Sequence, residues 1–303
     1  MLTSIRVLVA VGATLAALGP AGPAHAVRGP LECFAEVPGV TPRGVPTTFT
    51  YDDGRTTSEN RGPDDLGYQP RDVAYPHDVG GGADRAGRTA PVTSHWFTLS
   101  GDQLREVTEV DRRDPRGLLI AAEYRTHVVR RHWEGVRQIS IGRDRDHLYV
   151  LTNTDQLLQY RISGQDGSTT VKLAATVGTG FGTIGTLEYA RTVTTGDGAR
   201  SDVFLTTDAD TGALVELTIP VDAPTTYSRT VLATEGWLEM RSAGRTASCI
   251  NARSGRSYDG IVGVDADGQV LLWTDRDAKD GSGEDIVARG VLKSDWKPMA
   301  YSD

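Results

Sequence analysis

A strand–turn–strand segment that recurs along the chain constrains the fold more than any other feature of this sequence. The turn residues of successive copies are separated by 58, 53, 57 and 56 residues: Gly44, Asp102, Asp155, Gly212 and Gly268. Around these turns apolar and polar residues alternate, as in residues 147–162 and 202–219, which is typical of β-hairpins. A repeat of hairpins with this period predicts an all-β fold made of similar units.

A second marker, an aromatic residue, follows each turn after 24 to 31 residues: Tyr68, Trp133, Phe181, Trp237 and Trp296. Five turns that alternate strictly with five aromatics predict a five-bladed β-propeller, a ring of four-stranded sheets. Residues 295–303 resemble a first strand without its hairpin, and residues 33–44 resemble a hairpin without its first strand. We therefore expect the N- and C-terminal strands to pair and close the ring, with the aromatics packed between blades.

The segment from Gly180 to Gly185 fits GxGxxG, the pattern of a dinucleotide-binding turn. Such a turn should open a helix and be followed by an acidic residue at the end of the next strand. Here β-branched residues follow, and the segment occupies the aromatic position of the third copy. The glycines therefore indicate the start of a strand, and we expect no nucleotide or other cofactor.

The first 26 residues have the pattern of a secretory signal peptide. One basic residue, Arg6, precedes an apolar run over residues 7–18, and the small residues around Ala26 predict cleavage after it. No other segment is apolar enough to insert into a membrane. The sequence therefore predicts a secreted protein, with residues 27–303 as a single propeller domain.

The two cysteines, Cys33 and Cys249, are far apart in the sequence. In an oxidising compartment they predict one disulfide, because no local motif supports the alternative of a catalytic thiol. The formal net charge of −8 comes without a basic run, which disfavours nucleic acid as a partner.

The copies also resemble tachylectin-type five-bladed propeller lectins. The least interrupted copy, residues 133–160, has an aromatic residue, alternating apolar positions, "LYV" and then "DQLLQY". The fourth copy keeps Gly236-Trp237 and "IVGVDADGQVLLW" at residues 261–273. The resemblance implies noncovalent binding of an extracellular glycan or cell-surface polysaccharide. Here the repeats carry insertions, at residues 76–94 and 245–260, so five equal sugar sites are not expected.

We expect the ligand to lie on rim loops, where Asp and Asn side chains can bond sugar hydroxyls and an aromatic face can stack on a ring. Trp96 is the aromatic expected to be exposed, with a place in the core as the alternative. The candidate ligand-binding residues are Trp96, Asp146, Asn153, Asp155, Asp265 and Asp267.

No metal site is expected from the sequence. "DADTG" and "DADG", which begin at Asp208 and Asp265, are similar to calcium loops but lack the full set of oxygen ligands. Asp and Gly are also the residues that tight turns require. The histidines do not fall at metal-ligand spacing.

Two other classes of function stay open. One is a scaffold that binds another secreted protein or forms part of a larger assembly. The other is a glycoside hydrolase, which needs two carboxylates facing each other. Glu134, Glu188 and Glu239 lie on expected inner strands, but no catalytic motif is present, so the sequence favours a protein that is not an enzyme.

Overall fold

The computed structural model describes residues 31–60, 65–75, 92–113, 119–143, 145–164, 167–298 and 300–301. In these residues the chain is all-β, with one short 3₁₀ helix, η1 (Pro224–Thr226). The predicted signal peptide lies outside the described residues. None of the described segments forms a helix that is long and apolar enough to cross a membrane.

Three sheets have four antiparallel strands each, in sequence order. The first sheet contains β4 (Asp72–Ala74), β5 (Val92–Ser100), β6 (Gln103–Arg113) and β7 (Leu119–Arg130). The second contains β8 (Val136–Ile141), β9 (His147–Thr152), β10 (Gln156–Ser163) and β11 (Thr170–Thr179). The third contains β12 (Ile184–Thr194), β13 (Arg200–Asp208), β14 (Leu214–Pro220) and β15 (Ser228–Ala233).

The fourth sheet is larger and has eight strands, seven of them in the order β19-β18-β17-β16-β1-β2-β3. The early strands are β1 (Leu31–Val40), β2 (Pro46–Asp52) and β3 (Arg55–Asn60). The late strands are β16 (Met240–Asn251), β17 (Ser257–Asp265), β18 (Val270–Asp275) and β19 (Val287–Lys293), together with β20 (Ala300–Tyr301), which pairs with β1.

The prediction of a closed five-bladed propeller is wrong, because the described strands form four sheets rather than five separate ones. The reason lies in β1, which is hydrogen-bonded along both edges. One edge pairs with β2, while the other pairs with β16 through residues 31–35 and with β20 through Gly39 and Val40. The pairing of β1 with β16 merges two sets of strands into one continuous sheet.

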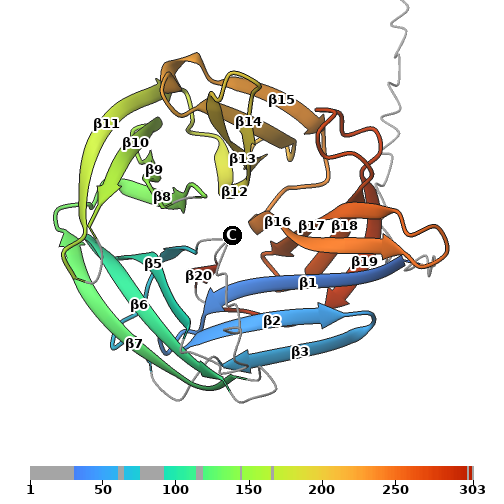
Figure 1. The fold of residues 1–303 in the computed structure, drawn as a ribbon, viewed down its shortest axis with the longest axis horizontal. Helices are drawn as coiled ribbons and strands as arrows, with labels where there is room; N and C mark the ends of the chain where they lie inside the picture. Colours follow the sequence, from blue (N-terminus) through green and yellow to red (C-terminus); the bar gives the residue numbers. More distant parts are fainter. Residues whose placement is uncertain are drawn as a thin grey trace, which may run out of the picture.

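The four sheets lie around a common centre, with β8, β12 and β16 near it and β7, β11 and β15 outermost (Figure 1). The apolar core is divided among the spaces between neighbouring sets of strands. Phe97 and Leu104 of the first sheet, for example, pack with Trp133 and Ile139 beside the second. The apolar side chains on the faces of each sheet are thus buried against the neighbouring sheet, which removes them from water.

The two sequence markers are joined by a backbone hydrogen bond in four of the five copies, while in the first copy the Gly44 carbonyl accepts the N–H of Leu66. In four copies the aromatic residue donates its N–H to the carbonyl of the turn marker, over 2.9–3.1 Å: Trp133 to Asp102, Phe181 to Asp155, Trp237 to Gly212 and Trp296 to Gly268. These four aromatics are buried and Tyr68 is half-buried, so the expected packing role is confirmed. β12 begins at Ile184, within Gly180–Gly185, so the segment enters a strand and not a helix.

The predicted disulfide between Cys33 and Cys249 is confirmed. The two residues are direct partners in the β1–β16 ladder, and both are buried. Such a bond indicates folding in an oxidising environment.

Candidate functional site

A polar pocket of about 370 Å³ lies between strands that belong to different sheets. Its walls come from β4, β8, β12, β16 and β20, or from residues next to them. The volume falls in the range of roughly 300–1,000 Å³ that is usual for small-molecule sites. Its charged and amide lining residues are Arg71, Asp72, Arg137, Gln138, Glu188 and Arg241.

Arg71 joins the first sheet to the second at this pocket. Its guanidinium donates to the carbonyls of Gly101, 3.4 Å away, and Arg137, 3.3 Å away, and also to that of Val136. The neighbouring Asp72 accepts the N–H of Ile139 over 2.6 Å. These bonds satisfy backbone groups at the start of β8, so Arg71 and Asp72 hold two pocket walls together.

Arg137 joins the second sheet to the third in the same way, by donating to backbone carbonyls just before β12. Its guanidinium donates to the carbonyls of Phe181 and Gly182, both over 3.0 Å. Partial burial lowers the pKa of Arg137, and the Asp155 carboxylate opposes this shift. The guanidinium stays charged, because the pKa of an arginine lies far above neutrality.

Gln138 lines the pocket and has one buried polar atom without a partner from the described segments. Its amide nitrogen donates to the carbonyl of Gly185 over 2.6 Å. Its Oε1 is buried and has no hydrogen-bond partner among the residues that the structure describes. A water or a ligand hydroxyl would satisfy this acceptor.

Arg241, on β16, differs from the other two arginines. Its side chain is exposed at the pocket, and within the described part of the chain it makes no hydrogen bond or ion pair. Together with Glu188, which is buried on β12, it gives the pocket both a free cation and a carboxylate. Three arginines against two acidic residues make the lining cationic, which favours an anionic group on a ligand.

The six residues predicted to bind a ligand are not brought together. None of them is among the described residues that line the pocket. Asn153 and Asp155 lie exposed on the β9–β10 turn. Asp265 accepts the N–H groups of Asp267 and Gln269 over 2.9 and 2.8 Å, which is the turn role that the sequence offered as the alternative to calcium binding.

Trp96 is in the core, so the prediction of an exposed stacking face is wrong. Its side chain is 1% exposed and packs on Tyr75, with ring centroids 5.4 Å apart. On β5 its side chain points to the opposite face from those of His95 and Phe97, but both faces of this strand are covered. Period-2 alternation alone could not distinguish a covered face from an open one.

Asp146 takes part in an ion-pair cluster, with its side chain 38% exposed. Its carboxylate lies 3.0 Å from Nδ1 of His147 and 2.7 Å from the Arg200 guanidinium. His147 and then Arg200 hold the pKa of Asp146 well below its ordinary 3.8, although partial burial opposes them. The carboxylate therefore links the segment before β9 to β13.

This pair gives a pH-dependent prediction. A lowered pKa in the folded state contributes stability above the unfolded value of 3.8, and that stability is lost as the pH falls through and below it. We expect Asp146→Asn to lose about 1 kcal/mol or less of unfolding free energy at pH 7, since the ion pairs are partly screened by solvent, and to lose clearly less at pH 2, where part of the wild-type stabilisation is gone. Urea unfolding at both pH values measures this, with exposed Asp222→Asn as the control. An equal loss at both pH values would contradict it.

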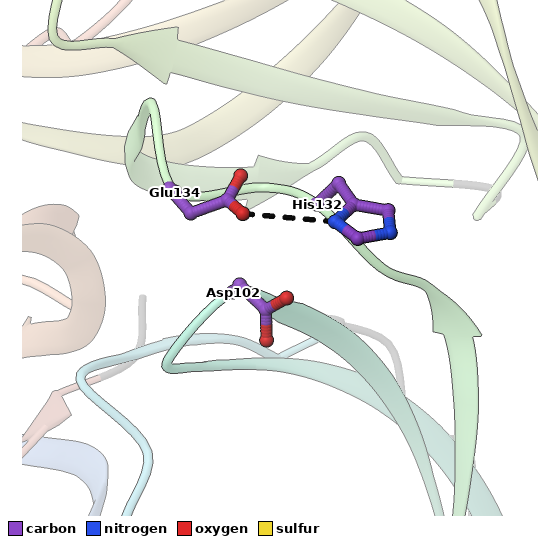
Figure 2. A group of neighbouring side chains, drawn as sticks. All are labelled: Asp102, His132 and Glu134. Carbon is purple, nitrogen blue, oxygen red and sulfur yellow. Dashed lines mark ion pairs between the residues drawn. The ribbon is translucent and has the colours of Figure 1, made fainter.

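Three residues outside the pocket could hold a metal ion: Asp102, His132 and Glu134 (Figure 2). Spacing did not reveal them, because Asp102 lies on the β5–β6 turn, 30 residues before His132. The bond from Trp133 to Asp102 brings the two segments together. Of the three glutamates considered for hydrolysis, only Glu188 is among the described pocket residues.

No family model matches the chain, and no curated protein matches it. Among solved structures, the chain has a distant likeness to the crystal structure of TolB from Acinetobacter baumannii, with 12% sequence identity and a TM-score of 0.38. The alignment covers 90% of this chain and 67% of that one. A likeness this distant carries no argument about function, and the resemblance to tachylectin-type lectins stays a prediction.

Proposed function

We propose that the protein is secreted and binds an extracellular glycan noncovalently in the central pocket, through an acidic group on the sugar. The observation that carries this proposal is the exposed Arg241 guanidinium, which has no partner in the described chain. A guanidinium matches the two oxygens of a carboxylate and binds them through parallel hydrogen bonds. The disulfide supports the extracellular setting.

The rest of the lining suits the hydroxyl groups of a sugar. Gln138 offers a buried acceptor, and Glu188 offers a carboxylate on the neighbouring strand. Arg71 and Arg137 are bound to backbone carbonyls, so they form rigid walls and contribute positive charge without moving. Such preformed polar groups give orientation and specificity to a small site.

A glycan array followed by calorimetry tests this proposal. We expect sugars with a carboxylate, such as uronic acids or muramic-acid fragments of peptidoglycan, to bind, and neutral sugars of equal size to bind at least about tenfold more weakly. Arg241→Gln should weaken binding of the acidic sugar by about 10- to 100-fold, the value of a charged hydrogen bond. Exposed Arg253→Gln, outside the pocket, is the matched control.

Two results would contradict the proposal. One is the absence of binding to every acidic and neutral glycan on the array. The other is an Arg241→Gln protein that binds acidic sugars as tightly as the wild type.

Hydrolysis is the second candidate, because Asp72 and Glu188 line the same pocket. Two facing carboxylates are the requirement for glycosidic cleavage. Product analysis after long incubation with the bound oligosaccharide distinguishes the two activities. The protein would be assigned as an enzyme if the wild type produces new reducing ends and neither Asp72→Asn nor Glu188→Gln does.

A further inference from the structure

Asp102, His132 and Glu134 form a compact group of ligand atoms on the surface. One nitrogen or oxygen atom from each lies within 4.8 Å of the others, and His132 Nδ1 is 3.7 Å from Glu134 Oε1. Figure 2 shows Asp102 facing the other two side chains across the gap between two chain segments. The His132 and Glu134 side chains are 83% and 67% exposed, so they can rotate to close the remaining distance.

The backbone under this group is fixed on both sides. Trp133, between His132 and Glu134, is buried and donates its N–H to the carbonyl of Asp102 over 2.9 Å. Arg71 binds the carbonyls of Gly101 and Val136, which flank the two segments. The fold thus sets the separation of the ligand-bearing residues and leaves only their side chains free.

The other copies of the repeat show that this backbone arrangement does not need these three side chains. The same turn-to-aromatic hydrogen bond forms at Phe181, Trp237 and Trp296. In these three copies the residue before the aromatic, equivalent to His132, is Gly180, Gly236 or Asp295. The residue after it, equivalent to Glu134, is Gly182, Leu238 or Lys297. The turn residue, equivalent to Asp102, is Asp155, Gly212 or Gly268. Among these four copies, three metal-ligating side chains meet only at Trp133.

His132 also occupies an unfavourable backbone conformation. Its φ of 64° lies in the left-handed region, where glycine is at ease and a β-carbon is strained. Gly180 and Gly236 have φ values of 80° and 98° at the same position. Asp295, the counterpart in the last copy, has a φ of 61°, so the turn accepts residues other than glycine at this position and leaves the imidazole free to serve another purpose.

We propose that Asp102, His132 and Glu134 bind one divalent transition-metal ion of the zinc class. An imidazole nitrogen with two carboxylate oxygens is a donor set that Zn²⁺ and Co²⁺ accept, whereas Ca²⁺ prefers oxygen ligands alone. Three protein ligands leave at least one coordination position for water. This site is separate from the central pocket and does not depend on the proposed glycan binding.

Metal titration of the full chain, prepared without an affinity tag, tests the proposal. Zn²⁺ is added in competition with a chromophoric chelator, and the visible spectrum of Co²⁺ reports the ligand field. We expect one ion per chain, and we expect His132→Gln, Asp102→Asn and Glu134→Gln each to weaken Zn²⁺ binding by at least about tenfold, since even indirect contacts to a metal have effects of this size. His127→Gln, which changes an exposed histidine on β7, should leave binding unchanged.

The proposal is overturned if the wild type binds no Zn²⁺ at millimolar concentration. It is also overturned if His132→Gln retains wild-type affinity, or if Ca²⁺ binds more tightly than Zn²⁺ and only the two carboxylate variants affect it. Circular dichroism on each variant separates loss of a ligand from loss of the fold.

Discussion

The double variant Cys33→Ala/Cys249→Ala is expected to lose about 5 kcal/mol of its free energy of unfolding. The bond joins residues separated by 216 positions, so it removes a large loop-closure entropy from the unfolded chain. It also fixes the ladder of β1 with β16, through which β16–β19 join the early strands in a single sheet. For a chain of ordinary stability this is a large share of the total, and unfolding near body temperature is expected.

Urea unfolding followed by tryptophan fluorescence measures this loss. Reduction of the wild type provides the control, because it breaks the same bond without deleting a buried side chain. The reduced wild type and the double variant should agree within about 1–2 kcal/mol, the part that comes from the two missing sulfur atoms. A loss below about 1 kcal/mol in both would show that the bond is not a major source of stability.

The second large effect is expected at the buried ion pair between Arg245 and Asp275. The guanidinium and carboxylate lie 2.8 Å apart, and their side chains are 6% and 1% exposed. Arg245→Met should lower the free energy of unfolding at pH 7 by about 3–5 kcal/mol, because it leaves a buried carboxylate without its cation. Burial raises the pKa of Asp275 even with Arg245 present, so the unpaired carboxylate should become protonated at mildly acidic pH.

The sign of the pH effect follows from that shift. A raised pKa in the folded state means that stability is greatest below the unfolded value and decreases as the pH rises. The loss in Arg245→Met should therefore be smaller at pH 4 than at pH 7. The double variant Arg245→Met/Asp275→Leu should recover most of it, because an apolar pair replaces a buried ion pair with little net change. Additive losses in a double-mutant cycle would contradict this view of the pair.

The regular part of this fold could be predicted because it is local. Each hairpin needs a turn residue and alternating strands, and each unit needs an aromatic residue to fill the space beside it. The hydrogen bond from Trp133 to Asp102 and its counterparts explain why the two markers recur together. The count of separate sheets was wrong for a nonlocal reason: the predicted disulfide from Cys33 to Cys249 indicates that the two segments are close, but not that they pair as neighbouring strands of one sheet.

The candidate site was harder to predict than the fold. Its residues come from five strands in different copies, so no single segment carries a recognisable motif. No sequence feature distinguishes Arg241 from other exposed arginines, and the alternation around Trp96 leaves both an exposed and a core position open, although its strand is covered on both faces. An alignment of the copies by their aromatic residue would have singled out His132 and Glu134, because their counterparts Gly180 and Gly182 are glycines.

The double pairing of β1 has a consequence for how the polypeptide is made. This strand leaves the ribosome long before β16 and β20, and until they arrive one of its edges exposes open N–H and C=O groups. Such an edge recruits foreign strands, and contacts across so much of the chain form slowly. The nascent protein should therefore depend on a holding chaperone until β16 and β20 have been synthesised.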